Sequence, residues 1–198
     1  MFMRYLNRIS IGLMLFLGAC VSSTEPLQLG YEVQLLPKRA LLQFVETKND
    51  EFYKFTFHEG KFTIIEKGDE DTPLPAAFHK IPGLPDGYHV GWTFMGKGSI
   101  FEANYYNIVW LEKSSSGGNQ LVMFAPSDEN REAIAAEMKI DPKDGPQIES
   151  AEEMVRYAQI LYKMRDQLNL ARLEIFDLAK KDDFEKAKAL TGAKFLAE

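Results

Sequence analysis

The sequence predicts an α+β protein: an antiparallel β-sheet curled into a small barrel or sandwich, then a short helix and a long C-terminal helix or helix pair. Two observations support this prediction. Between residues 31 and 125 apolar side chains recur at every second position, which is the period of a half-buried strand. After residue 127 they recur every three or four positions, which is the period of one helix face.

The first strands are predicted around a tight hairpin. Tyr31, Val33 and Leu35 alternate with polar residues, although residues 31–46 also allow a short helical turn. Two apolar runs flank Glu59-Gly60, where glycine supplies the positive φ that a short hairpin turn requires. We therefore expect paired strands on either side of residues 59 and 60.

The rest of the sheet is expected between turn-forming segments. The acidic residues 67–75 predict a loop. The segment 88–94 has the clearest strand pattern in the chain, with Tyr88, Val90, Trp92 and Phe94 on one face. The other strands are expected near 78–81, 100–113 and 121–125. About seven short strands in a row favour a sheet that curls on itself.

The helices are predicted from their capping residues. Ser127 or Asp128 begins a short helix that Asp141-Pro142 ends. Ser150 and Glu153 form a capping box for the next helix. The chain has no proline or glycine from there to Thr191, so this helix is expected to reach about residue 181 before Gly192 marks a C-cap. Its apolar seam is Met154, Tyr157, Ala158, Leu161, Met164, Leu168, Ala171, Ile175 and Leu178.

The N-terminus has the order of a secretory signal peptide. Arg4 and Arg8 precede a short apolar run, which is too short to span a bilayer. The run ends in Leu17-Gly18-Ala19-Cys20, which resembles the lipobox of bacterial lipoproteins. That resemblance implies cleavage before Cys20 and acylation of its sulfur, so that the lipid bilayer is the expected partner. The alternative is a cleaved signal that leaves a free cysteine.

The resemblance also implies a location in the cell envelope. An aspartate after the lipidated cysteine commonly retains lipoproteins at the inner membrane, and here Val21 and Ser22 follow. The outer membrane, facing the periplasm, is therefore favoured if the organism has two membranes. The layout of lipobox, β-meander and capped helix is similar to a loose set of exported bacterial proteins, which implies no activity.

Composition limits the classes of partner. The chain has 198 residues with 45% hydrophobic and 26% charged residues, typical of a globular protein. Removal of Arg4 and Arg8 with the signal takes the net charge from −6 to −8, which disfavours nucleic acid. The predicted organisation is a signal peptide at 1–19, a tether at 20–29, a β-domain at 30–126, a short helix and linker at 127–149 and a helical segment at 150–198.

Candidate ligand-binding residues are aromatic. Trp92, Tyr105, Tyr106 and Trp110 could line a groove for an apolar or glycan ligand, although such residues more often fill a small β core. Metal sites are a second possibility. His58 and His89 with Asp69 or Asp71 offer metal ligands, and 69–72 offers oxygens for calcium, but a solvated sheet face and an acidic turn explain both. We predict no metal and no cofactor.

No catalytic motif is present in the sequence. The serines at 114–116 lack a nucleophile-elbow pattern, and a lipidated Cys20 leaves no thiol nucleophile. The chain is therefore not expected to be an enzyme. The expected function is structural or protein-interacting, with an envelope protein bound by the long C-terminal helix. The alternative is a small-ligand binding module on the β-domain.

Overall fold

The computed structural model describes residues 21–45, 51–95, 103–125, 127–140 and 147–197. Its strands are β1 (Val21–Ser23), β2 (Arg39–Phe44), β3 (Phe52–His58), β4 (Lys61–Glu66), β5 (Asp69–Lys80), β6 (His89–Met95), β7 (Ala103–Lys113), β8 (Asn119–Ala125) and β9 (Asn169–Asp177). Its helices are α2 (Asp128–Met138), α3 (Ala151–Met164), the 3₁₀ turn η2 (Arg165–Gln167), α4 (Lys181–Thr191) and α5 (Ala193–Leu196).

The strands form a closed antiparallel barrel. From β2 to β8 each strand pairs with the next in sequence, and β9 lies between β8 and β2. The pairing of β7 with β8 closes the ring, so the eight strands β2 to β9 make the barrel. The strand β1 is additional and pairs with β7 where β8 no longer does. The predicted curled sheet is thus confirmed, as a barrel.

Side chains fill the barrel interior. Strand residues alternate between the interior and the outer wall, as the pleat requires. On β7, for example, Val109 points inward while Ile108 and Trp110 point outward. The inward cluster comprises Leu36, Ala40, Leu42, Phe44, Tyr53, Phe55, Phe62, Ala76, Phe78, Val109, Leu121, Met123, Ala171, Leu173 and Ile175. An eight-stranded barrel is just wide enough for such filling.

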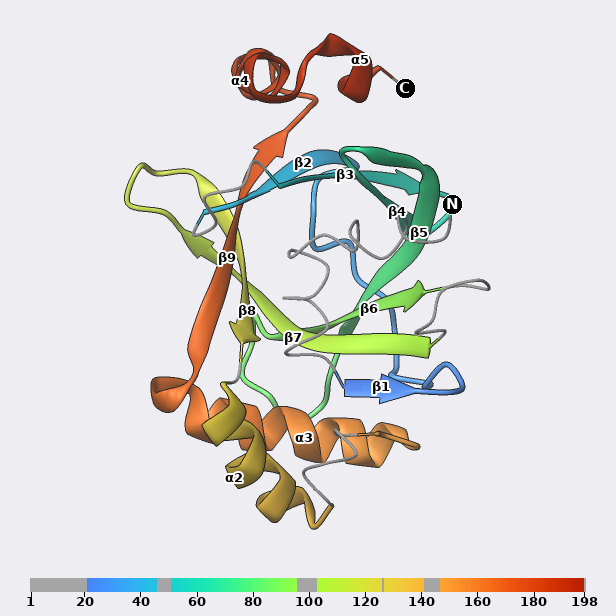
Figure 1. The fold of residues 1–198 in the computed structure, drawn as a ribbon, viewed down its shortest axis with the longest axis vertical. Coiled ribbons are helices and arrows are strands. Elements are labelled where there is room, and N and C mark those ends of the chain that lie inside the picture. Colours follow the sequence, from blue (N-terminus) through green and yellow to red (C-terminus); the bar gives the residue numbers. More distant parts are fainter. Residues whose placement is uncertain (1–20, 46–50, 96–102, 126, 141–146, 198) are drawn as a thin grey trace, which may run out of the picture.

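Two helical layers cover opposite walls of the barrel (Figure 1). The buried face of α3, which includes Tyr157 and Leu161, packs on outward residues of β6, β7 and β8. At the other end of the long axis, α4 and α5 cover outward residues of β2, β3 and β9, among them Leu41 and Phe176. At both walls the sheet therefore has the interior cluster on its inner face and an apolar helical layer on its outer face. No helix among the described residues is long and apolar enough to cross a membrane.

Several local predictions are confirmed. Glu59 and Gly60, with φ values of 49° and 86°, form the two-residue turn between β3 and β4, and His58 pairs with Lys61. The Ser127 side chain caps α2, and the Ser150 hydroxyl accepts a hydrogen bond from the Glu153 amide at the start of α3. The reciprocal half of the predicted capping box differs, because the Glu153 carboxylate accepts from the Glu149 amide at 2.8 Å. Gly192 ends α4. The predicted stop at 141–142 lies outside the described residues.

The prediction of one long C-terminal helix is wrong. The helix ends at Met164, and residues 169–177 form β9. Without β9, the edges of β2 and β8 would be unpaired, and an open sheet edge is unfavourable. Ala171, Leu173 and Ile175 alternate with polar residues and face the barrel interior, and Phe176 under α4 and α5 interrupts this pattern. Leu168, Ala171 and Ile175 also fit the spacing of a helix face, which explains the wrong prediction.

Two further expectations are corrected. The acidic residues 69–75 form the first half of β5, where they are mostly exposed and pair with β4 on one side only. Their prolines are tolerated because none of the described strands pairs with the other edge there. Residues 31–35 form no regular strand, and β2 begins at Arg39, so the helical turn considered for 31–46 is also absent from its described part.

Candidate binding site at the barrel mouth

The four aromatic residues predicted as a ligand groove do not converge. Trp92, Tyr106 and Trp110 point to the outer wall under α3 and the N-terminal segment, whereas Tyr105 points to the opposite face of β7. The indole of Trp92 donates to Asn104 Oδ1 at 3.0 Å, and that of Trp110 donates to Glu112 Oε1 at 2.7 Å. Their polar atoms are thus engaged within the protein, as in a core.

The histidines are also dispersed. The side chain of His58 is 83% exposed at the tip of β3, while His79 and His89 lie on β5 and β6. Among the described residues no group of three or more His, Cys, Asp or Glu side chains is placed to hold a metal ion.

A strap formed by residues 31–38 runs from β5 to the start of β2. β5 extends beyond its last pair with β4, which leaves one edge of its end unpaired. The strap pairs with this edge, because the Val33 amide donates to the Phe78 carbonyl at 2.8 Å and the Lys80 amide donates to the Tyr31 carbonyl at 3.3 Å. Leu36 from the strap is 2% exposed and belongs to the interior cluster. The strap therefore covers this side of the barrel mouth.

A hollow of about 280 Å³ lies between the strap and the tip of the β3–β4 hairpin. Its residues are Glu32, Val33, Gln34, Phe57, Gly60, Phe62, Ala77 and Phe78. The Phe62 ring centroid is 4.8 Å from that of Phe57 and 5.6 Å from that of Phe78, so the three rings pack against one another, with Phe62 and Phe78 2% and 5% exposed. This volume is just below the usual range for ligand pockets, about 300–1,000 Å³, and barrel mouths are common sites for them.

The ionisable groups near the hollow are the side chains of Glu32 and His79, which differ in charge. Glu32 lines the hollow, and its backbone forms an isolated antiparallel β-bridge with His79. Burial lowers the pKa of His79, an effect that the Glu32 charge partly opposes. Its Nδ1 atom is buried without a hydrogen-bond partner among the described residues. His79 is therefore neutral near pH 7, and Glu32 is the charged side chain among the lining residues.

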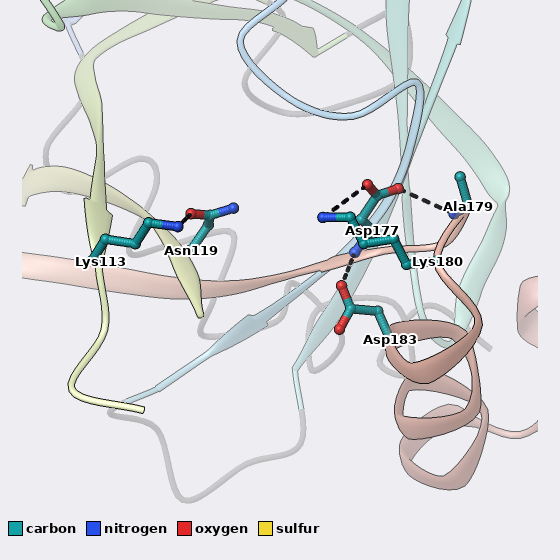
Figure 2. Close-up of polar contacts among 6 residues, drawn as sticks. All are labelled: Lys113, Asn119, Asp177, Ala179, Lys180 and Asp183. Atoms are coloured by element: carbon teal, nitrogen blue, oxygen red, sulfur yellow. Dashed lines mark hydrogen bonds and ion pairs between the residues drawn. The ribbon is translucent and has the colours of Figure 1, made fainter. Parts of the chain in front are cut away.

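A second polar cluster, at the turn between β9 and α4, is structural (Figure 2). Asp177 Oδ1 accepts from the Ala179 amide at 3.1 Å, and its Oδ2 lies 3.4 Å from Lys180 Nζ. Asp183 Oδ2 accepts from the Asp177 amide at 3.2 Å. These contacts fix the start of α4 and leave Asp177 paired on both oxygens.

Sequence reasoning missed the hollow because its walls come from segments far apart in the chain. The sequence pattern places Val33 on one strand and Phe57 and Phe62 on the two strands around Glu59-Gly60. The signal that was present is Gly30, whose φ of 94° turns the chain into the strap. No family model, curated protein or solved structure matches this chain.

Proposed function

We propose that this chain is an exported lipoprotein, anchored through acylated Cys20, whose barrel binds a small and mainly apolar ligand in the hollow at its mouth. The hollow beneath the strap carries the ligand-binding part of this proposal, and the lipobox carries the anchor. The proposed location is the cell envelope, at the outer membrane if the organism has two membranes. The proposed role is binding without catalysis.

The lining predicts the chemical class of the ligand. The rings of Phe57, Phe62 and Phe78 favour an apolar or aromatic body. The Glu32 carboxylate favours a positively charged or hydrogen-bond-donating group beside that body, and Gln34 can accept or donate. A compact aromatic molecule with an amine satisfies both requirements within about 280 Å³.

The protein-interaction role was expected from a long C-terminal helix, and that helix is interrupted by β9. The seam of α3 is buried against the barrel wall, and Ala171 and Ile175 face the barrel interior. A truncation before Leu168 would remove β9 from the ring, so it would not leave a folded β-domain.

Ligand binding is tested with the fluorophore 1-aminoanthracene, a neutral aromatic amine, on a soluble form carrying Cys20→Ser. We expect fluorescence enhancement that saturates. Val33→Phe fills the hollow and should abolish the fluorescence enhancement. Leu35→Phe adds a ring to the strap at a position that does not line the hollow, so it should retain the enhancement. Equal binding by both variants, or no binding by the parent protein, would show the proposal to be wrong.

The charge preference is tested by displacement of the fluorophore. Phenethylamine should displace it at lower concentration than phenylacetate does, because only the amine is attracted to Glu32. Glu32→Gln should remove this difference, while Glu25→Gln, at an exposed carboxylate outside the lining, should retain it. The anchor is tested separately, by metabolic labelling with an alkyne fatty acid, which Cys20→Ser should prevent.

A further inference from the structure

We propose that the lipid anchor has almost no tether, so that the barrel wall beside β1 is held against the lipid headgroups and α4 and α5 face away from the bilayer. This inference rests on the proposed acylation of Cys20. It concerns the partner surface, which neither the lipobox nor the composition specifies.

The first residue after the anchor is already part of the fold. Val21 is fully buried, and in β1 it pairs with Tyr106 of β7. The other edge of β1 is also bound, because the Ile148 amide donates to the Ser22 carbonyl at 2.9 Å. A strand fixed on both edges cannot act as a flexible linker.

The residues after β1 are fixed as well. Asn104 Nδ2 donates to the Thr24 carbonyl at 3.2 Å, and the Leu27 amide donates to the Tyr106 hydroxyl at 2.8 Å. Leu29 is 5% exposed. The segment expected as a tether at 20–29 is therefore bound to the barrel over its described part, residues 21–29.

The chain length between anchor and body follows directly. Adjacent Cα atoms are about 3.8 Å apart, so the acylated residue is one such step from buried Val21. A flexible tether of about ten residues would instead allow a root-mean-square span of roughly 17 Å. An acyl chain inserted in the bilayer therefore brings β1 to the headgroup level.

The fold then determines which surface faces the bilayer. β1 lies beside α3, in the half of the molecule that also holds α2, while α4 and α5 occupy the opposite end of the long axis (Figure 1). The exposed residues next to β1 include Thr24, Glu25 and Glu149. The two carboxylates favour uncharged or zwitterionic headgroups over anionic ones.

The test uses the acylated full-length protein in phosphatidylcholine vesicles that contain a headgroup spin-labelled lipid. Cys20 is the only cysteine in the chain, so once it is acylated an introduced cysteine is the single free thiol. A fluorophore is attached at Thr24→Cys, beside β1, or at Lys186→Cys, an exposed position on α4. A second form of each carries a Gly-Ser insertion of about twelve residues between Cys20 and Val21.

We expect the spin label to quench the fluorophore at position 24 severalfold more than that at position 186, and the insertion to reduce this difference strongly. Equal quenching at both positions in a protein that floats with the vesicles would overturn the close contact while leaving the anchor intact. A difference that survives the insertion would show that the short connection is not its cause. If the protein does not float with vesicles at all, the anchor itself is wrong.

Discussion

Leu173 discriminates between the closed barrel and the long helix that the sequence pattern predicts. In the helix, the seam passes through Leu168, Ala171 and Ile175, and Leu173 lies on the opposite face. In the barrel, Leu173 is fully buried and pairs with Phe44 and Leu121 on the neighbouring strands. Ile175 does not discriminate, because it is inward in both arrangements.

Leu173→Ala should strongly reduce stability. Truncating a fully buried leucine removes the transfer free energy and leaves a cavity, which together cost about 2–5 kcal/mol. With a loss of about 3 kcal/mol and a urea m value of about 2 kcal/mol per molar, the unfolding midpoint falls by about 1.5 M. The assay is urea unfolding of the Cys20→Ser form, followed by far-ultraviolet circular dichroism.

Glu174→Ala is the matched control on the same strand. Its side chain points to the outer wall and is half-buried, so the free energy of unfolding should change by about 0.5 kcal/mol or less. The barrel assignment of β9 would be refuted if Leu173→Ala and Glu174→Ala had the same midpoint as the parent protein.

Three other predictions concern the mouth and the helices. Burial lowers the folded-state pKa of His79 and of His89 below 6.5, so the unfolded state binds more protons than the folded state does. The free energy of unfolding should therefore fall as pH decreases from about 6.5 towards the folded pKa values. His79→Gln should weaken this pH dependence in urea midpoints measured from pH 7.5 to 5. Lys54, which is 7% exposed and donates to the Phe195 carbonyl at 3.0 Å, fixes α5, so Lys54→Ala should speed amide exchange in α4 and α5 and leave the barrel strands protected. Ser150→Ala removes the cap of α3 and should cost about 1 kcal/mol, whereas Ser150→Asp should be nearly neutral in the same unfolding assay.

Local signals predicted the parts of the fold that depend on a few neighbouring residues. The Glu59-Gly60 turn follows from the positive φ that a two-residue hairpin requires. The start of α3 follows from the Ser150 hydroxyl, which accepts from the Glu153 amide. The outward face of β6 was also identified, although Val90 packs against the helical layer and not in the barrel interior.

Long-range constraints decided the parts that the sequence did not reveal. β9 is a strand because two distant edges, on β2 and β8, require a partner. The period-two pattern of residues 171–175 is the local signal for it, and it competes with the helical spacing of Leu168, Ala171 and Ile175. The hollow exists because the strap at Val33 pairs with the end of β5 at Phe78. Residue type alone made aromatic residues such as Trp110 candidates for ligand binding, but their burial against α3 gives them a core role.

Occupancy of the hollow is tested most directly by methyl resonances in a ligand titration. The Cys20→Ser form, labelled at alanine, valine and leucine methyl groups, is titrated with phenethylamine while methyl spectra are recorded. We predict that the resonances of Val33, which lines the hollow, shift and saturate, while those of Val122, on the outer wall under α3, do not move. Unchanged Val33 resonances at saturating amine would contradict ligand binding at the barrel mouth.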